Sequence, residues 1–308
     1  MRIGLIDVDG HNFPNLALMK LSAWHKAQGD TVEWWYSDLI HYDIVYMSKV
    51  FSDSYSPDVP EPLNVGKVVK GGTGYAISLM DGVEVYDKAK DPPLPPEVEA
   101  MCPDYSIYPD LFPDTAIGFL TRGCPRGCKF CHVAAKEGRK SVQVAELFDF
   151  YRGQGNIEIM DPNILANKNR EKLLEDLIGT KAKVNFNQGL DIRFASDGIA
   201  EPLGRLRIKR LHFAWDNHKE DLTSYFQRFG SQYRRKAVAG KMVYVLTNFG
   251  STQEEDLWRI YTLRDMGFDP YVMVYDKPNA SKEVKRLQRW CNNKFIFKSC
   301  RDFREYKP

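Results

Sequence analysis

The stretch TAIGFLTRGCPRGCKFCH, residues 115–132, joins an apolar run to three closely spaced cysteines. The apolar run is typical of a buried strand. Cys124, Cys128 and Cys131 follow it in a C-x3-C-x2-C spacing, so half of the chain's 6 cysteines lie within this one loop. A loop that follows a strand of a parallel sheet lies at the carboxyl edge, where α/β proteins place their active sites. The stretch therefore predicts both a fold class and the position of a site.

A regular alternation of strands and helices begins with this stretch. Each β/α unit spans roughly 30 residues, a spacing that suits the crossovers of a parallel barrel. The sequence predicts strands at residues 115–123, 157–161, 183–189, 210–216, 242–250 and 269–275, and helices at 141–155, 169–180, 196–207, 219–229, 252–267 and 281–293. Residues 115–280 are therefore expected to form a partial (β/α)6 barrel, and residues 281–308 a C-terminal helix and tail.

The pattern of strands and a helix in residues 1–100 predicts a small Rossmann-like domain. Residues 52–64 contain three prolines and are expected to form a loop in place of a crossover helix. The proline-rich residues 101–114 are interpreted as a linker, so the predicted fold class is α/β with two domains. The elements expected in the first domain are strands at 2–9, 31–36, 43–51 and 65–72, and a helix at 15–30.

Composition excludes several classes of protein. The 308 residues are 43% hydrophobic and 27% charged, which is ordinary for a globular protein. No apolar run approaches the roughly 20 residues of a membrane span, and the acidic start does not resemble a signal peptide. We therefore expect a cytoplasmic protein without membrane contact, whose cysteines stay reduced.

The charge is unevenly distributed along the chain. Residues 1–120 carry 8 Lys and Arg against 18 Asp and Glu, whereas residues 201–308 carry 22 against 13. A basic C-terminal third favours an anionic substrate. The alternative is a solvated surface that complements the acidic N-terminal part.

Three cysteines in one short loop indicate a metal site. A structural zinc site needs a fourth ligand, and His132 is too close to Cys131 in sequence to complete one tetrahedral ion with it. A [4Fe–4S] cluster held by only three thiolates leaves one iron open, which suggests that a substrate or cofactor binds there. The residues thus favour a cluster, with zinc as the alternative.

The motif, with Phe130 just before its last cysteine, resembles the hallmark of the radical SAM superfamily. The resemblance implies a [4Fe–4S] cluster on Cys124, Cys128 and Cys131, with S-adenosylmethionine (SAM) chelated to the open iron. It implies reductive cleavage of SAM to methionine and a 5′-deoxyadenosyl radical, which abstracts hydrogen from an unidentified substrate. An electron donor such as a flavodoxin or ferredoxin is implied as well.

Segments at later strand ends resemble the SAM-binding motifs of this superfamily. They are MDPNIL, FNQGLDIR, FAWDN and VLTNFGSTQEEDL, where an asparagine stands in place of the usual glycine. The alternatives are a turn and cap at 161–163, an ion pair between Asp191 and Arg193, and a helix cap at Asp216. The resemblance assigns the SAM contacts to Phe130, Asp161, Asn163, Gln188, Asp191, Arg193, Asp216 and Asn248.

Residues 13–38 and 68–76 resemble parts of the cobalamin-binding domains that are fused to some radical SAM barrels. That resemblance implies a cobalamin-dependent methyltransferase, with His11 as a candidate cobalt ligand. The short domain and its prolines argue instead for a relic that does not retain cobalamin. A third hypothesis, of another class, is a non-catalytic module that binds zinc and nucleic acid. Cys102, Cys291 and Cys300 are expected to be buried thiols, with a second cluster as the alternative.

Overall fold

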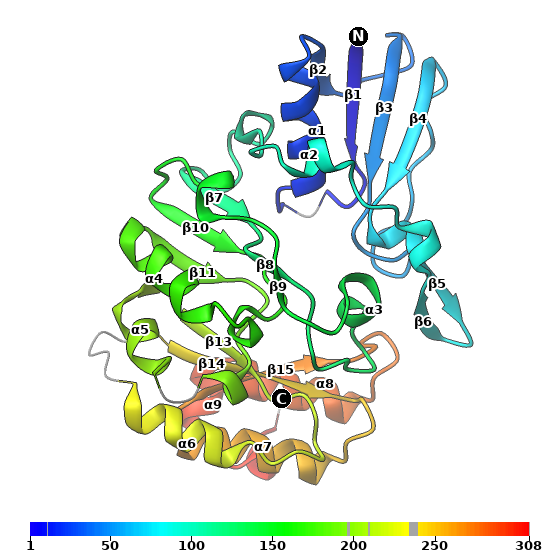
Figure 1. Cartoon of the computed structure of the whole chain (residues 1–308). Helices are drawn as coiled ribbons and strands as arrows, with labels where there is room; N and C mark the ends of the chain where they lie inside the picture. The colour runs from blue at the N-terminus through cyan, green and yellow to red at the C-terminus, as the bar shows by residue number, and fades with distance from the viewer. Residues whose placement is uncertain (11, 196–197, 209, 234–239, 308) are drawn as a thin grey trace. The chain divides into compact units, whose positions relative to one another are not determined.

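The computed structural model describes residues 1–10, 12–195, 198–208, 210–233 and 240–307, and it divides into two compact units (Figure 1). Unit 1 comprises Met1–Gly118, Gly123–Arg139 and Val144–Gln154. Unit 2 comprises Phe119–Arg122, Lys140–Gln143 and Gly155–Pro308. The units therefore differ from the expected boundary at residue 115, because the cysteine loop groups with the N-terminal elements.

Unit 1 is built on a parallel sheet with the strand order β2-β1-β3-β4. These strands are Thr31–Trp34, Arg2–Asp7, Tyr42–Ser48 and Val65–Gly71. Helix α1 (Leu16–Ala27) lies along this sheet in Figure 1, and its Leu18 and Leu21 pack with Ile3 and Leu5. Asn15 caps α1 by accepting from Leu18 N, and its Nδ2 donates to Ser48 Oγ at 2.9 Å. The α1 face is thus fixed to the sheet by apolar burial and by a buried polar contact.

The rest of unit 1 consists of short elements. Strands β5 (Ile77–Met80) and β6 (Val83–Tyr86) form an antiparallel hairpin, and β7 spans Thr115–Gly118. Helices α2 (Pro96–Glu99) and α3 (Val133–Glu137) are each only about one turn long. Residues 49–64, all of them described, contain no helix, in keeping with their three prolines.

Residues 101–114 are held within unit 1 by polar contacts with other parts of the unit. The Tyr105 hydroxyl donates to Phe150 O at 2.9 Å and accepts from Ile117 N at 3.1 Å. Asp104 accepts hydrogen bonds from Ser22 Oγ and Lys26 Nζ, both at 2.6 Å. The expected linker is therefore an ordered part of the unit.

Unit 2 contains two parallel sheets. Strands β10 (Asn156–Ile159), β11 (Lys183–Phe186) and β12 (Arg207–Ile208) pair in sequence order. Strands β13 (Arg210–Ala214), β14 (Gly240–Thr247) and β15 (Asp269–Val274) do the same. A parallel bridge joins Leu190, which follows β11, to Phe213 in β13, and so links the two sheets. The α/β class with parallel sheets is confirmed.

Helices alternate with these strands, as Figure 1 shows for the green to red part of the chain. Helix α7 begins with a capping box between Thr252 and Glu255, and α8 is capped by Ser281. Apolar residues of α7 and α8, such as Leu263 and Leu287, are buried, and both helices contact β15. The helices of unit 2 are α4 (Arg170–Thr180), α5 (Ala200–Arg205), α6 (Thr223–Gln232), α7 (Gln253–Asp265), α8 (Lys282–Asn292) and α9 (Lys294–Ser299).

The predicted helix at residues 141–155 is wrong. Val142–Gln143 instead forms β9, which pairs antiparallel with β8 (Thr121–Arg122). A single 3-10 turn follows at Leu147–Asp149, and Gly153 has a φ of +100°. The β-branched Val142 and Val144 favour extended backbone, and this local preference prevails over the helical spacing of the later apolar residues.

Within the described residues, no helix is both long and apolar enough to cross a membrane.

We expect Asp104→Asn to lower the free energy of unfolding at pH 7 by roughly 1–2 kcal/mol, because it removes the charged acceptor for Lys26. Burial opposes ionisation of Asp104, but hydrogen bonds from Lys26, Ser106 and Ser22 hold its pKa at about 2. The stability that this carboxylate contributes is therefore present above pH 4 and is lost as the pH falls toward 2. Urea unfolding of wild type and variant at pH 7 and pH 3 measures both effects.

Glu97→Gln, at an exposed position of α2, serves as the control for Asp104→Asn. A difference between Asp104→Asn and wild type that does not shrink at the lower pH would contradict this account.

Candidate functional site

The cysteine loop is closed at its base by hydrogen bonds from two backbone amides. Cys124 N donates to Gly138 O at 3.1 Å, and Gly123 N donates to Glu137 Oε2 at 3.0 Å. Gly123, with a φ of +88°, adopts a conformation that is rare for L side chains, which explains the glycine before the first cysteine. Strands β8 and β9 pair just outside this base. The ends of the loop are thus held together on both sides of the cysteines.

Helix α3, which follows the cysteines, is anchored within unit 1 by two side chains. His132 Nε2 lies 3.5 Å from Glu84 Oε2, and its ring lies beside Tyr86 with 6.1 Å between centroids. Lys136 Nζ lies 3.0 Å from Asp91 Oδ2 and also contacts Thr73 Oγ1. His132 is therefore engaged with the hairpin, which argues further against its use as a fourth zinc ligand.

The cysteine side chains fit an iron–sulfur cluster by their chemistry but are not gathered around one centre. Cys131 N donates to Cys128 O at 3.0 Å, so these two residues share one turn. Cys124 and Cys128 are half-buried, whereas Cys131 is exposed. Among the described residues, however, no group of three or more His, Cys, Asp or Glu side chains is arranged to hold a metal.

Asp161, which follows β10, bonds to the residues that lead into the cysteine loop. Its Oδ1 accepts from Leu120 N at 2.7 Å, and its Oδ2 accepts from Thr121 N at 2.7 Å and Thr121 Oγ1 at 2.6 Å. Asp161 is only 3% exposed, and burial raises the pKa of its carboxyl to about 6 although these donors oppose the shift. Both carboxyl oxygens thus hold the backbone directly ahead of Gly123.

Asn163, Asp191 and Arg193 form one connected polar group. Asn163 Nδ2 donates to Asp191 Oδ2 at 3.3 Å, and Arg193 Nε donates to Asp191 Oδ1 at 2.6 Å. Arg193 Nη1 continues the group to Glu220 Oε2 at 2.7 Å. Burial opposes the charge of Arg193, but Asp191 and Glu220 raise its pKa. The ion pair considered from the sequence is present, and Asn163 extends it to the segment after β10.

Gln188 lies in the turn after β11 and is exposed. The turn closes by a hydrogen bond from Gly189 N to Phe186 O at 3.1 Å, with Gly189 at a φ of +83°. A glycine at this position allows the chain to reverse without strain. The Gln188 side chain is therefore presented at the carboxyl end of β11.

Asp216 follows β13, and burial raises the pKa of its carboxyl to about 6 despite the nearby charge of Arg259 and a backbone hydrogen bond from Leu246. The alternative in which Asp216 caps the next helix is wrong, because Leu222 holds the N-cap position of α6. Asp216 is thus a partly desolvated acid at the end of a strand.

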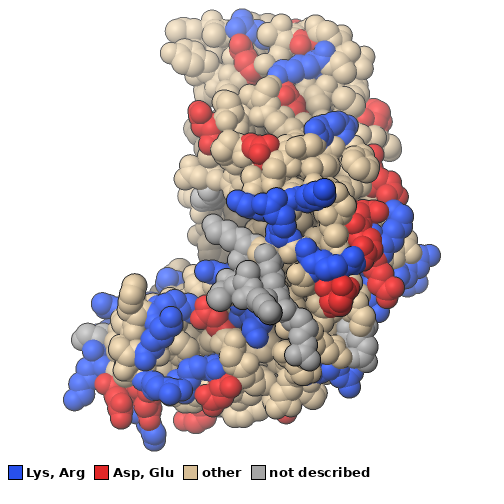
Figure 2. Space-filling model, turned by 90° about the vertical axis from the view of Figure 1, so that its left-hand side faces the viewer, with Lys and Arg blue, Asp and Glu red and all other residues tan. Residues whose placement is uncertain are grey.

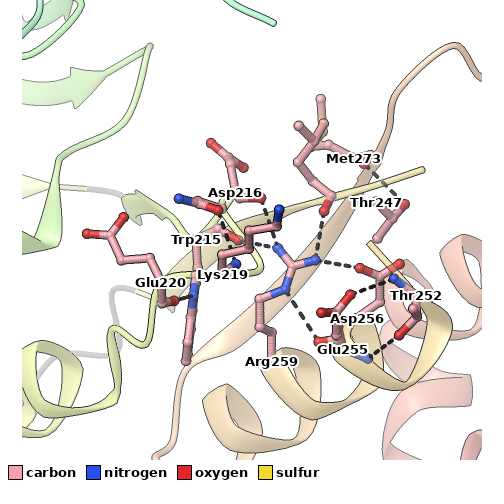
Figure 3. A network of polar contacts seen from close by, with 12 residues as sticks. Trp215, Asp216, Lys219, Glu220, Thr247, Thr252, Glu255, Asp256, Arg259 and Met273 are labelled. Carbon is pink, nitrogen blue, oxygen red and sulfur yellow. Dashed lines mark hydrogen bonds and ion pairs between the residues drawn. The ribbon is translucent and has the colours of Figure 1, made fainter. Parts of the chain in front are cut away.

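Arg259, which the sequence analysis missed, joins the ends of β13 and β14 (Figure 3). Its guanidinium donates to Trp215 O at 2.7 Å, to Asp216 O at 3.2 Å and to Leu246 O at 2.9 Å. It also pairs with Asp256 one turn earlier in α7, and Arg259 is fully buried. The signal in the sequence is a charged pair at 256 and 259 on the same helix face as the buried Ile260 and Leu263.

Asn248, at the end of β14, adopts a φ of +62°, and its Nδ2 donates to Tyr275 O at 2.8 Å. Asparagine tolerates the left-handed region better than most residues. This backbone conformation explains how asparagine replaces the glycine of the resembled motif. Phe130 is half-buried in unit 1.

Parallel pairing brings seven of the predicted residues to one edge of unit 2. They all come shortly after the carboxyl ends of β10, β11, β13 and β14, namely Asp161, Asn163, Gln188, Asp191, Arg193, Asp216 and Asn248. This edge is where parallel α/β proteins bind ligands. The four residues of the cysteine motif, by contrast, belong to unit 1.

The remaining cysteines bond to backbone carbonyls at separate places. Cys291 Sγ donates to Pro270 O at 3.4 Å, and burial raises the pKa of Cys291 to about 12. Cys300 Sγ donates to Asp302 O at 3.2 Å, and burial raises the pKa of Cys102. The expectation of buried thiols is confirmed for Cys291, but it is wrong for Cys102 and Cys300, which are half-buried. Among the described residues these thiols form no metal-binding group. His11 lies outside the described residues.

Some of the basic side chains in the C-terminal third form ion pairs with acidic residues. Lys294 Nζ lies 2.6 Å from Asp269 Oδ1, and Arg205 contacts both Glu175 and Glu201. Figure 2 shows Lys and Arg side chains interspersed with Asp and Glu on the face that it draws. The surface thus carries mixed charges, with positive charge in excess in residues 201–308.

We expect Asp161→Ala to lower the free energy of unfolding by roughly 2–4 kcal/mol, because Leu120 N, Thr121 N and Thr121 Oγ1 lose their acceptor while buried. Chemical unfolding of the full chain measures the loss. Asp161→Asn keeps one acceptor oxygen and should lose less. Glu171→Ala, at an exposed position in the first turn of α4, is the control. A loss below about 0.5 kcal/mol for Asp161→Ala would refute this role.

The raised pKa of Asp216 predicts a pH dependence of stability. Between pH 4 and pH 6 the folded chain retains a proton on Asp216 that the unfolded chain releases, so this contribution to stability is lost as the pH rises. We expect the stability of wild type relative to Asp216→Asn to fall by about 1–2 kcal/mol between pH 4.5 and pH 6.5. Urea unfolding at both pH values is the measurement. Parallel pH profiles for the two proteins would contradict the assignment.

Comparisons with known proteins supply no family. No protein-family model matches the chain, and no curated protein matches it.

Proposed function

We propose that this protein is a radical SAM enzyme. The observation that carries the proposal is the C-x3-C-x2-C loop with Phe130 before its last cysteine, set directly after a strand and closed at its base by Gly123 and Cys124. Three thiolates suit an iron–sulfur cluster and leave one iron without a protein ligand. When bound, such a cluster supplies the electron that cleaves SAM and yields a 5′-deoxyadenosyl radical.

The carboxyl edge of unit 2 supports the assignment of a SAM-binding role to its residues. In a parallel sheet this edge is the usual ligand-binding position, and a partial (β/α)6 barrel is the fold that we propose for it. Gln188 is exposed there, and Arg193 provides a charged donor for a carboxylate. Asp216 offers a carboxyl group whose pKa burial raises to about 6, although the Arg259 guanidinium opposes this shift.

Asp161 is proposed to act by positioning the cysteine loop. Its two carboxyl oxygens already accept three hydrogen bonds from Leu120 and Thr121. This arrangement fixes the backbone that enters the loop and leaves Asn163 as the better candidate for contact with the amino group of SAM. The contacts of the eight residues assigned to SAM stay predictions.

The partners follow from the same proposal. Reductive cleavage needs an electron donor, and a flavodoxin or ferredoxin is the class that we propose. The excess of positive charge in residues 201–308 favours an anionic substrate. Cobalamin is not expected in unit 1, since its four-stranded sheet has a helix after β1 but none in residues 49–64.

Iron, sulfide and 5′-deoxyadenosine analyses test the proposal together. Anaerobically reconstituted wild type should hold about four irons and four sulfides and, with a strong reductant, should convert SAM to 5′-deoxyadenosine. The Cys124→Ala, Cys128→Ala, Cys131→Ala triple variant should lose both. The matched control is the double variant Cys102→Ser, Cys300→Ser, which changes thiols outside the motif and should behave as wild type.

The outcomes separate the alternatives. A full cluster in the motif variant would refute the ligand assignment, and an intact cluster without any 5′-deoxyadenosine would refute the radical enzyme. Zinc in place of iron would support the zinc and nucleic-acid module. Stoichiometric retention of hydroxocobalamin would support the methyltransferase.

A further inference from the structure

A pocket of about 310 Å³ lies in unit 1 at the carboxyl ends of β1 and β2. Asp7 ends β1 and Trp34 ends β2, and residues 107–111 supply the opposite wall. We call it the Trp34 pocket and define it by the lining residues Asp7, Phe13, Trp34, Tyr108 and Asp110. Ligands of open α/β sheets bind outside the carboxyl ends of the strands. The volume is at the lower end of the range of small-molecule sites.

Three aromatic side chains line this pocket, and their orientations are fixed. Trp34 Nε1 donates to Ile107 O at 3.1 Å, and the Trp34 ring meets Tyr108 edge to face with 5.0 Å between centroids. Phe13 meets Phe112 in the same manner at 4.9 Å. Trp34 nevertheless remains 38% exposed. A large aromatic ring is therefore held rigidly with part of its surface open to a ligand.

The charge in the Trp34 pocket is negative. Asp7 accepts a hydrogen bond from the Tyr108 hydroxyl at 2.7 Å, and its other partners are backbone amides of Asp9 and Gly10. Burial raises the pKa of Asp7, and the charge of Asp9 adds to the shift. Asp110 stands at the exposed rim. Among the described lining residues there is no lysine or arginine.

A rigid aromatic wall beside a carboxylate, with no lysine or arginine among the described lining residues, is the combination that recognises organic cations. The face of an aromatic ring attracts an ammonium group, most strongly when the ring is tryptophan. A partly desolvated carboxylate gains from a cation nearby, whereas an anionic ligand would be repelled by Asp7 and Asp110. We propose that the Trp34 pocket binds a small organic ammonium ion, with its cationic head between Trp34 and Asp7. This site is separate from the chemistry proposed for the cysteine loop.

Choline and its neutral isostere 3,3-dimethylbutan-1-ol provide the test, because they share a shape and differ in charge. Isothermal titration of the full chain should give a dissociation constant for choline on the order of 1 mM or lower. The neutral isostere should bind at least about fivefold more weakly, since it loses the cation–π and carboxylate attraction. Trp34→Leu and Asp110→Asn should each weaken choline binding, Trp34→Leu by at least about fivefold.

Two controls keep this test interpretable. Tyr36→Leu removes an aromatic ring that is 81% exposed and does not line the pocket, and Glu97→Gln removes an exposed carboxylate of α2. Both should bind choline as wild type does, and thermal unfolding should show that each variant is folded. The partly exposed Trp34 and the rim residue Asp110 are chosen because neither belongs to the buried core.

Three results would overturn the proposal. They are equal affinity for choline and the isostere, wild-type affinity in a folded Trp34→Leu variant, and no choline binding up to about 50 mM. Loss of binding in the control variants would equally reject the Trp34 pocket as the place of binding. Iron content and 5′-deoxyadenosine formation are independent of these readouts.

Discussion

The hydrogen bonds of Asp161 are the constraint on which the proposed site depends most. A carboxylate that is 3% exposed accepts from Leu120 N, Thr121 N and Thr121 Oγ1, all at 2.6–2.7 Å. Desolvation makes such a buried acid costly unless donors surround it. The donors belong to Leu120 and Thr121, at the start of β8. Asp161, which follows β10, therefore fixes the position of the chain that enters the cysteine loop. The antiparallel pairing of β8 with β9 then fixes the exit of the same segment.

Arg259 plays a corresponding part at the ends of β13 and β14. A buried guanidinium without acceptors would be strongly destabilising, but here the carbonyls of Trp215, Asp216 and Leu246 surround it together with Asp256. These carbonyls belong to the points where each strand leaves the sheet, so the network sets the directions of the following loops. Polar groups buried in this way hold the carboxyl edge rigid.

The sequence predicted the elements of both units well where apolar runs are short and bounded by turn residues. Strands β1, β10 and β15 and helices α1, α7 and α8 lie where the pattern placed them. It failed at 141–155, where the local preference of Val142 for extended backbone is reinforced by pairing with the strand before the cysteines, a contact that no local pattern contains. The sequence pattern also placed Asp161 and Asp191 correctly at strand ends, but it could not identify the groups to which their carboxylates bond. Whether a carboxylate faces a ligand or bonds to backbone is decided by tertiary contacts such as those with Thr121 and Arg193.

The absence of a helix in the described residues 49–64 has a consequence for what unit 1 can bind. In a full doubly wound domain, crossover helices wall the carboxyl ends of the strands. Residues 49–64 lie between β3 and β4, whereas residues 107–111 line the carboxyl ends of β1 and β2. The Tyr105 and Tyr108 hydroxyls hold this segment by hydrogen bonds to Phe150 O and Asp7. A wall made of aromatic side chains leaves a small cavity, and the acids at the ends of β1 give that cavity a negative charge. Unit 1 thus has a small anionic and aromatic pocket at the ends of β1 and β2, which favours a compact cation over a large cofactor.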